Sequence, residues 1–298
     1  MKEKKTIAVM GATGRQGGSV ARFLLNDGTF AVKVLTQLIA KGAEVARADL
    51  DDVETLKKAF EGVYGVFGMT NFWEPGVGYE REIRQGKNLV DAAKAKNVKH
   101  FVWSTLDRDT AKPAHWESKA EVNDYLIASG VPWTSLYTSF FFENYCGLVS
   151  PQKQPDGSYK IPLIMIADIP FAVNSAAETG AFVLAAFLHP EEWINKDIKI
   201  ATDFLSPNRI AELMSEVSGR KVFVDQINKE QFDNDKSLPE EVHNKYVLRV
   251  QPLTCFEGAL QDNPGPPFRD PELTRKLYPE MKTFESWVKE NQKDIFRN

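Results

Sequence analysis

A glycine-rich loop near the start of the chain has the residue types and the spacing that can bind a diphosphate. The loop lies between an apolar, strand-like segment at residues 6–10 and a segment with an apolar helical face, and it reads Gly11-Ala12-Thr13-Gly14-Arg15-Gln16-Gly17. Its three spaced glycines permit a tight turn, close approach of the backbone to phosphate, and close packing of helix on strand. The N–H groups and the positive dipole end of such a helix would hold the diphosphate of a dinucleotide. The alternative is a glycine turn that binds no ligand.

Within this loop, Arg15 favours a dinucleotide with a 2′-phosphate, because a guanidinium pairs with phosphate where an acidic residue would repel it. The end of the second expected strand, residues 34–37, shows no acidic residue that would bind a ribose 2′-hydroxyl. We therefore predict NADP(H) as the cofactor, with NAD(H) as a weaker second choice. The alternative for Arg15 is an ordinary solvated surface charge.

Polar residues follow the next two expected strands, at the carboxyl edge where ligands gather in such sheets. Asp49-Leu50 follows the third strand and is expected near adenine, while Asp51-Asp52 could equally supply an N-cap for the next helix. Thr70-Asn71 follows the fourth strand and is expected beside the ribose and phosphates, with a structural turn as the alternative. Arg84 lies one helical turn beyond Glu80, so a solvated pair with Glu80 is the alternative to a cofactor contact.

The elements that must position these residues alternate between strand-like and helix-like apolar periods through the first half of the chain. This order predicts an α/β fold: a Rossmann-type, doubly wound parallel sheet with a smaller C-terminal α+β lobe. The expected strands are residues 6–10, Phe30–Thr36, Ala43–Arg47, Gly65–Met69, His100–Ser104 and Trp133–Tyr137. The expected helices among them are Val53–Phe60, Tyr79–Lys96 and Glu117–Ser129, besides the one that follows the glycine loop.

After Pro151 a polar stretch with an Asp156-Gly157 turn replaces the strict alternation, so we place a domain boundary there. Residues 1–150 are predicted to form the dinucleotide-binding domain and residues 151–298 the smaller lobe, with the chain returning to the main sheet at about 175–203. The expected elements beyond the boundary are a helix Ala176–Leu188, a strand Ile198–Ala201, helices Pro207–Ser218, Lys229–Asp233, Pro239–Arg249 and Phe284–Glu290, and a stiff connector Pro264–Pro267.

One connection is shorter than this fold requires. A crossover between parallel strands takes about 10 to 12 residues, yet only Gln37 to Gly42 separates the second expected strand from the third. We therefore expect that a loop and half a helix are missing from the sequence at this point, with a second candidate join near Thr110-Ala111.

Composition argues against several classes of protein. The 298 residues carry a net charge of −4, and no cluster of basic residues runs along one helix, so we expect no direct nucleic-acid binding. No tract of roughly 18 apolar residues could span a bilayer, and the charged start lacks the apolar region of a secretion signal, so we expect a cytoplasmic protein without a membrane segment. Cys146 and Cys255 are far apart, and His100, His189 and His243 lack metal-ligand spacing, so we expect neither a disulfide framework nor a metal site.

The chain resembles the NmrA family, atypical relatives of the extended short-chain dehydrogenases, and in particular the redox-sensor branch of that family. The resemblance spans nearly the whole chain and is carried by GATGRQGGSVARFLL from Gly11, GAEVARADLDD from Gly42, TNFWE from Thr70, and the stretch Ser139–Tyr145. It implies that NADP(H) is held between a Rossmann lobe and a small C-terminal lobe. It also implies a role in reporting redox state to a regulatory protein partner, in the cytoplasm and also the nucleus. A homodimer is a further candidate assembly.

Carried over by position, the family pattern implies cofactor contacts from both lobes. These are Gly11 through Gln16, Asp49, Thr70, Asn71, Phe72, Arg84, Lys119, Phe141, Phe142, Glu143 and Asn144, to which the loop and strand arguments above add Gly17 and Leu50. The aromatic run Phe140–Phe142 would wall the nicotinamide pocket, with core packing as the alternative. The family also has an arginine just after the second strand that meets the 2′-phosphate, and this chain has Gln37 in that place.

The catalytic apparatus of the related dehydrogenases is altered. Those enzymes place a tyrosine and a lysine four residues apart on one helix, and the lysine lowers the tyrosine pKa so that the phenol can exchange a proton with a carbonyl substrate. Here the stretch runs from His115 to Lys119, so histidine replaces the tyrosine, while Ser104 stands where a substrate-orienting hydroxyl is expected. A neighbouring cation should lower the histidine pKa and make it a poor acid. We expect little or no dehydrogenase turnover, and the alternative is an NAD(P)H-dependent quinone or carbonyl reductase that uses Lys119 with His115 or Ser104.

Overall fold

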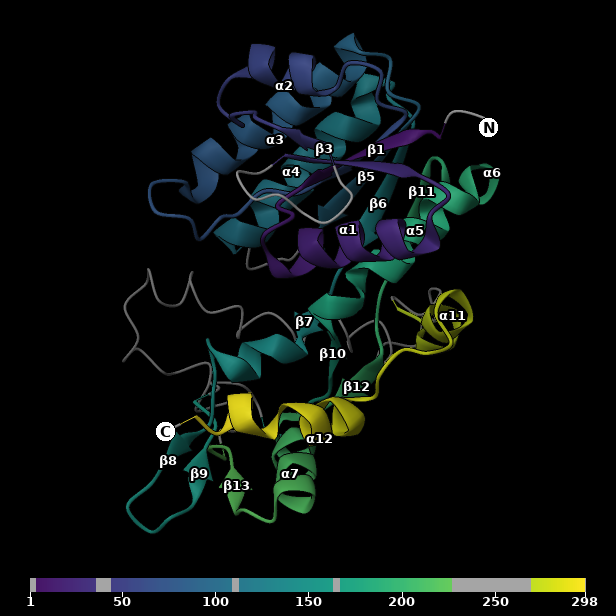
Figure 1. The fold of residues 1–298 in the computed structure, drawn as a ribbon. Coiled ribbons are helices and arrows are strands. Elements are labelled where there is room, and N and C mark those ends of the chain that lie inside the picture. Colours follow the sequence, from purple (N-terminus) through teal and green to yellow (C-terminus); the bar gives the residue numbers. More distant parts are fainter. Residues whose placement is uncertain (1–3, 36–43, 109–112, 163–166, 227–268, 298) are drawn as a thin grey trace, which may run out of the picture. The chain divides into compact units, whose positions relative to one another are not determined.

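The computed structural model describes residues 4–35, 44–108, 113–162, 167–226 and 269–297 (Figure 1). By its contacts the chain divides into two compact units. Unit 1 contains Met1–Arg108, Ala114–Thr138 and Ala176–Lys199, and unit 2 contains Asp109–Pro113, Ser139–Ser175 and Ile200–Asn298. The domain boundary after residue 150 stays a prediction.

Unit 1 is built on one sheet of seven parallel strands. In spatial order these are β11 (Lys196–Lys199), β6 (Trp133–Tyr137), β5 (His100–Thr105), β4 (Gly65–Gly68), β1 (Thr6–Met10), β2 (Ala31–Leu35) and β3 (Glu44–Ala46). The direction of winding reverses at β1, which pairs with β2 on one side and with β4 on the other. The predicted Rossmann-type sheet is confirmed, and its topological switch point lies between β1 and β4, where such sheets bind ligands.

Helices cover both faces of this sheet (Figure 1). On one face lie α2 (Val53–Ala59), α3 (Gly78–Ala95) and α4 (Ala114–Ser129), and on the other lie α1 (Arg15–Asp27) and α5 (Thr179–Leu188). The central strands are therefore apolar on both sides: Ile7, Ala8 and Val9 of β1 have no exposed surface. This two-sided burial explains why the strands read as continuous apolar runs rather than as alternating ones.

A buried serine fastens α1 to the segment that returns to the sheet. The Ser19 hydroxyl donates to the carbonyl oxygen of Ala177 at 2.6 Å, and the Gly180 N–H donates to the Ser19 hydroxyl at 3.0 Å. Ala177 belongs to a short 3-10 turn, η2 (Ala176–Glu178), and Gly180 to the first turn of α5. A Cβ atom at Gly180 would lie 2.4 Å from the carbonyl oxygen of Ser19, so glycine lets the two helices approach closely.

Unit 2 has two small sheets and an aromatic core. One sheet has the order β12 (Asp203–Leu205), β10 (Phe171–Asn174) and β7 (Phe140–Phe141), and the other has the order β13 (Val222–Phe223), β9 (Tyr159–Lys160) and β8 (Gln152–Lys153). The helical elements are η1 (Phe142–Cys146), α7 (Pro207–Ser218), α11 (Pro271–Leu277) and α12 (Phe284–Ile295). Phe142 packs against Phe284 and Trp287, with ring centroids 5.2 and 5.6 Å apart. These rings join η1 to the closing helix.

The structure corrects several predicted boundaries. Helix α4 begins at Ala114 rather than Glu117, because His115 and Trp116 are buried by tertiary packing and extend the helix backwards. The strand expected at Ile198–Ala201 is Lys196–Lys199, and the last helix continues to Ile295 instead of ending at Glu290. Helix α6 (Pro190–Trp193), helix α11 and the short strands of unit 2 were not predicted. The expected helices Lys229–Asp233 and Pro239–Arg249, the Pro264–Pro267 connector and both suspected joins lie outside the described residues.

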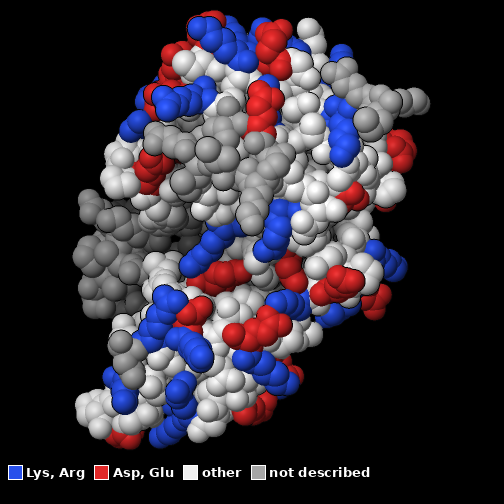
Figure 2. All heavy atoms as spheres, viewed as in Figure 1, with Lys and Arg blue, Asp and Glu red and all other residues white. Residues whose placement is uncertain are grey.

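Acidic and basic side chains are mixed over the visible surface. Figure 2 shows them interspersed on the face that it presents, in both units. Among the described helices, none combines the length and the apolar character needed to cross a membrane. Within the same ranges, no group of three or more His, Cys, Asp or Glu side chains is arranged to hold a metal ion.

Candidate functional site

The glycine loop turns the chain from β1 into α1 within four residues. Gly11 has φ of +62°, a left-handed conformation that favours glycine, and the Gly14 N–H donates to the Gly11 carbonyl oxygen at 2.8 Å. A Cβ atom at Gly17 would lie only 2.2 Å from the carbonyl oxygen of Met10. The predicted roles of Gly11 in a tight turn and of Gly17 in close helix packing are thus confirmed.

Gly14 differs from the other two glycines because its dihedral angles do not require glycine and an added Cβ atom would be crowded less severely. Its backbone is extended, with φ of −89° and ψ of 178°, a conformation open to any residue. An added Cβ atom would meet only the Gly11 carbonyl oxygen, at 3.3 Å. Helix α1 starts here with no side-chain cap and no acidic residue in its first turn, whereas Asp52 caps α2 by accepting from the Glu54 and Thr55 N–H groups. An anion would find an uncapped positive helix end at this position.

Two predicted residues from different elements meet beside the loop. Gln16 lies in the first turn of α1 and Ser104 near the carboxyl end of β5, and the Ser104 hydroxyl donates to the Gln16 side-chain oxygen at 2.8 Å. Ser104 is buried, with 3% of its surface exposed. The hydroxyl proposed to orient a substrate is therefore already engaged in positioning Gln16.

Lys119 is held by a buried carboxylate that sequence reasoning missed. The Lys119 ammonium lies 2.7 Å from Oε1 of Glu82 and donates to the Thr70 carbonyl oxygen at 3.0 Å. Glu82 has no exposed surface, and its carboxylate also accepts from the hydroxyls of Thr70, at 2.9 Å, and of Ser118. The arrangement ties the end of β4 to α3 and α4, and it neutralises the lysine that a dehydrogenase would use to activate its acid.

His115 is buried against aromatic rings. Its ring centroid lies 5.0 Å from that of Trp73 and 5.7 Å from that of Phe72, and 5% of the residue is exposed. Burial, and to a smaller extent the nearby Lys119 ammonium, lowers the pKa of His115 from its ordinary 6.5 to about 4. The predicted effect of the lysine is borne out in direction, but desolvation is the larger cause. At neutral pH the imidazole is uncharged, so it lacks the acidic proton of an imidazolium and is a poor acid.

The acids after β3 have separate structural tasks. A carboxylate oxygen of Asp49 accepts from the Asp51 N–H at 2.9 Å, and Asp52 is the N-cap of α2. The Asp49 N–H donates to the Thr55 hydroxyl at 2.9 Å, which closes the loop onto α2. Asp49 and Leu50 therefore lie on an ordered turn at the carboxyl edge of the sheet, next to the start of α2.

Asp51 gathers a polar cluster from α3. Its carboxylate accepts from Arg81 at 2.8 and 2.9 Å, from Arg84 at 3.1 Å and from the Gln85 amide at 2.9 Å. The Arg81 hydrogen bonds, followed by those from Gln85 and Arg84, hold the pKa of Asp51 near 2, below its ordinary 3.8. Arg84 is thus an ion-pair partner of Asp51, rather than of Glu80 as one alternative had it. The spacing of Arg81, Arg84 and Gln85 on one helix face could have suggested a cluster, but not its partner.

The remaining predicted contacts belong to unit 2. Phe141 ends β7, and Phe142, Glu143 and Asn144 form the start of η1. Phe142 has no exposed surface, which favours core packing for this residue, and the Glu143 carboxylate accepts from the Ser175 hydroxyl at 2.8 Å. The contacts of these four residues with a cofactor stay a prediction.

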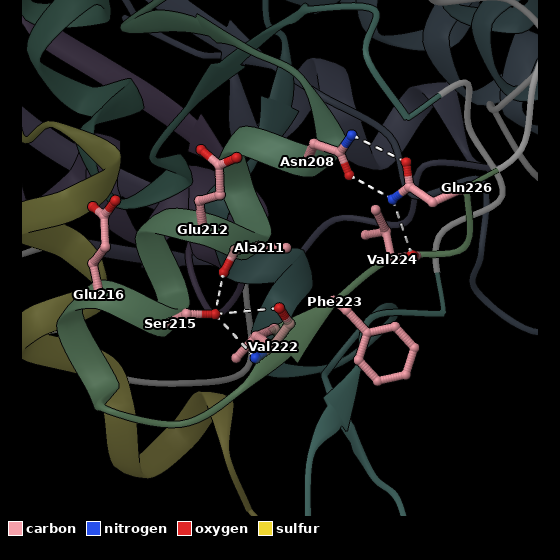
Figure 3. A pocket seen from close by; sticks show the side chains of 9 residues that line it. All are labelled: Asn208, Ala211, Glu212, Ser215, Glu216, Val222, Phe223, Val224 and Gln226. Carbon is pink, nitrogen blue, oxygen red and sulfur yellow. Dashed lines mark hydrogen bonds between the residues drawn. The ribbon is translucent and has the colours of Figure 1, made fainter.

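A pocket in unit 2 is lined by none of the predicted site residues. It lies between α7 and β13 (Figure 3) and is lined by Asn208, Ala211, Glu212, Ser215, Glu216, Val222, Phe223, Val224 and Gln226. Its amides bond to each other, with Gln226 donating to Asn208 at 2.7 Å, and the Ser215 hydroxyl donates to the Ala211 carbonyl oxygen at 2.8 Å. Because these polar groups already serve the local fold, the glycine loop and the carboxyl edge of unit 1 remain the better candidate site.

Known proteins resemble this chain in sequence and in fold. The sequence profile of the NmrA-like family matches residues 3–288. An NmrA-like family domain-containing protein of Dictyostelium discoideum is 28% identical over 86% of this chain and 97% of its own length. An NmrA-like family domain-containing oxidoreductase, himF of Aspergillus japonicus, is 29% identical over 72% of this chain and 73% of its own length. The crystal structure of NmrA, a negative transcriptional regulator, in complex with NADP is 25% identical, with a TM-score of 0.77 and coverage of 97% of this chain and 95% of that one.

We predict that replacing Asp51 with asparagine changes stability in a pH-dependent way. A folded-state pKa below the ordinary value means that the carboxylate contributes stability that is present above about pH 4 and is lost as the pH falls toward 2. The Asp51→Asn variant should therefore unfold at lower urea concentration than the parent at pH 7, and the gap should close on acidification below about pH 4. A gap of constant size from pH 7 to pH 3 would contradict the assignment.

We also predict that Lys119→Met destabilises the fold. The substitution leaves the Glu82 carboxylate buried without its cation, which typically costs about 3 kcal/mol or more. Urea unfolding at neutral pH measures this loss. In the matched double variant, Lys119→Met with Glu82→Gln, most of the stability should return because no buried charge is left unpaired. Equal stability of parent and Lys119→Met would show that the pair contributes nothing.

Proposed function

Because the chain belongs to the NmrA-like family, we propose that it binds NADP(H) at the glycine loop and acts as a redox sensor rather than as a dehydrogenase. The observation that carries the binding proposal is the start of α1, which has no side-chain cap, no acidic residue in its first turn and a glycine at its N-cap. Such a helix end fits the diphosphate of a dinucleotide in both charge and space. The NADP complex of NmrA supports the choice of cofactor.

The remaining contacts follow from the resemblance and from position in unit 1. We assign the loop residues Gly11 to Gly17 to the diphosphate, Asp49 and Leu50 to the adenosine side, and Thr70, Asn71 and Phe72 to the ribose and nicotinamide side. These groups follow the carboxyl ends of β1, of the edge strand β3 and of β4, respectively, and ligands bind at that edge of such sheets. Arg15, and Arg84 released from Asp51, are the candidate partners of a 2′-phosphate. Lys119, Phe141, Phe142, Glu143 and Asn144 complete the proposed set. NAD(H) is expected to bind more weakly.

The sensor role rests on the state of the residues that replace a dehydrogenase's acid and base. His115 is neutral at physiological pH, Lys119 is committed to Glu82, and Ser104 is committed to Gln16. A hydride transfer to a carbonyl needs a proton donor near the developing oxyanion, and none of these groups is poised to supply one. The oxidoreductase name of one relative keeps a quinone or carbonyl reductase as the alternative.

A sensor must pass the redox state of its cofactor to something else. We infer a regulatory protein partner, because NmrA is described as a negative transcriptional regulator and because a net charge of −4 does not suit direct binding to nucleic acid. A homodimer is a second form in which the signal could appear. Action in the cytoplasm and also in the nucleus is part of the same proposal.

The loop assignment predicts a specific loss of affinity. Gly14→Val adds a branched side chain at the uncapped start of α1 and should weaken NADPH binding by roughly tenfold or more, equivalent to about 1.4 kcal/mol. The change should also lower the unfolding temperature somewhat, because the added Cβ atom would lie 3.3 Å from the Gly11 carbonyl oxygen, although the Gly14 dihedral angles are open to any residue. Calorimetric titration with NADPH and NADH, together with thermal unfolding, measures both quantities. Gly17→Ala is the matched contrast: its Cβ would collide with Met10, so it should lower the unfolding temperature more. Undiminished NADPH affinity in Gly14→Val would refute the assignment.

The sensor proposal predicts a response to cofactor without turnover. A ligand shifts a conformational equilibrium only by its different affinity for the two states, so NADPH and NADP⁺ should differ in their effect on limited proteolysis or on sedimentation. Identical behaviour with both cofactors and without any would count against a sensor. Steady NADPH oxidation with a quinone or aldehyde, abolished by Lys119→Ala, would instead support the reductase.

A further inference from the structure

Both ring nitrogens of His115 are buried, and neither has a hydrogen-bond partner among the residues that the structure describes. A neutral imidazole has one N–H donor and one acceptor nitrogen, and buried polar atoms in folded proteins are almost always paired. The other buried histidine of unit 1 shows the difference: Nε2 of His100 lies 2.7 Å from the Thr134 hydroxyl. Because that hydroxyl donates to the Trp193 carbonyl oxygen, it accepts from His100, whose imidazole is thereby positioned by the fold. The described part of the chain offers His115 no such partner.

The surroundings of His115 are aromatic and lie at the edge of the sheet. Phe72 and Trp73 pack on its ring from the segment after β4, and Trp116 lies next to it with ring centroids 6.4 Å apart. Trp73 covers this buried ring although 54% of its own surface is exposed. A ligand that displaced the Trp73 side chain would meet the imidazole between flat apolar walls.

The position of His115 on α4 links it to the candidate cofactor site through Lys119 and Thr70. Lys119 follows His115 by one turn of α4, and its ammonium contacts the Thr70 carbonyl oxygen, two residues before Phe72. The whole arrangement belongs to unit 1 and to the carboxyl end of β4. It does not depend on any residue of unit 2.

We propose that His115 is a ligand contact whose N–H donates to the carbonyl or carboxamide oxygen of a planar aromatic ring packed against Phe72 and Trp73. The ligand class follows from the chemistry: aromatic walls favour a flat π system in offset or edge-to-face contact, and the imidazole supplies one directed hydrogen bond. This inference rests on the proposed function, because the ring can be the nicotinamide of NADP(H). It can also be a separate aromatic carbonyl compound such as a quinone.

The low pKa of His115 is consistent with a binding role. An imidazole that stays neutral throughout the physiological range keeps the same donor and acceptor pattern and does not alternate between charged and uncharged forms. It orients a bound ring and does not transfer a proton to it.

Two variants that remove both ring nitrogens, His115→Phe and His115→Leu, test the inference by calorimetric titration of the full chain. The probes are NADP⁺, adenosine 2′,5′-bisphosphate, which has no nicotinamide, and menadione with and without NADP⁺. We expect adenosine 2′,5′-bisphosphate to bind parent and variants equally, and one of the two ring-bearing probes to bind the variants roughly threefold to tenfold more weakly. A loss confined to NADP⁺ identifies nicotinamide as the ring, and a loss confined to menadione identifies a separate ligand.

Stability distinguishes binding from packing. Removing unpaired buried nitrogens should leave the unfolding temperature unchanged or raise it, and His115→Gln, which keeps a donor and an acceptor, should retain much of the affinity. The control variant His100→Phe replaces another buried histidine, at the start of β5. It should leave the affinities for NADP⁺ and menadione unchanged. Equal affinity of parent and His115 variants for both ring-bearing probes, or no binding of either probe to the parent, overturns the inference. Failure of adenosine 2′,5′-bisphosphate to bind the parent would contradict the proposed function separately, because menadione alone still tests His115.

Discussion

The uncapped start of α1 can serve a ligand only because a glycine allows the helix to sit directly against the end of β1. A side chain at Gly17 would overlap the carbonyl oxygen of Met10, so any larger residue would push the helix away from the strand. With glycine there, the chain turns through Gly11 and enters α1 at the switch point of the sheet. The N–H groups of the first turn are then fixed by backbone packing and need no side chain to place them. The proposed cofactor site is built on this constraint.

The second determinant is the buried carboxylate of Glu82. It accepts hydrogen bonds from Thr70 and Ser118 and pairs with Lys119, and so fixes the end of β4 relative to α3 and α4. A lysine that is free to approach a tyrosine or a ribose can support proton transfer, whereas a lysine bound to a buried acid is chiefly a structural cation. In the proposed function, the fold that carries out hydride chemistry in dehydrogenases serves to bind a cofactor. His115, neutral and without a hydrogen-bond partner among the described residues, fits that proposal.

Much of the fold could be predicted because its signals are local. The apolar runs of β1, β4 and β5 are continuous, since parallel strands are covered on both faces, and the glycine spacing marked the turn into α1. The family could also be inferred, because the segments that carry the resemblance include the loop and the strand ends. The start of α4 could not, because the burial of His115 and Trp116 depends on residues distant in sequence. The short strands of unit 2 have two to four residues each, too few for a period to emerge.

The sequence predicted individual residues of the candidate site, but not the contacts between them. Thr70 and Lys119 were both named from the sequence, yet nothing in the order of residues shows that Glu82 lies between them. In the same way Arg84 was named, while its partner Asp51 lies 33 residues away and joins it only through the packing of α3 beside α2. Ion pairs between elements depend on tertiary geometry. For that reason sequence patterns identify the charged residues of a site better than they identify which residue each one pairs with.

The claim that the backbone of the α1 N-terminus binds the diphosphate is most directly tested by nuclear magnetic resonance of the amide groups. We expect titration with NADP⁺ to shift the backbone N–H resonances of Gly14, Arg15 and Gln16 strongly, and titration with nicotinamide mononucleotide, which has no diphosphate, to leave them nearly unchanged. Binding of NADP⁺ that perturbs other residues of unit 1 while these three resonances stay in place would contradict the account.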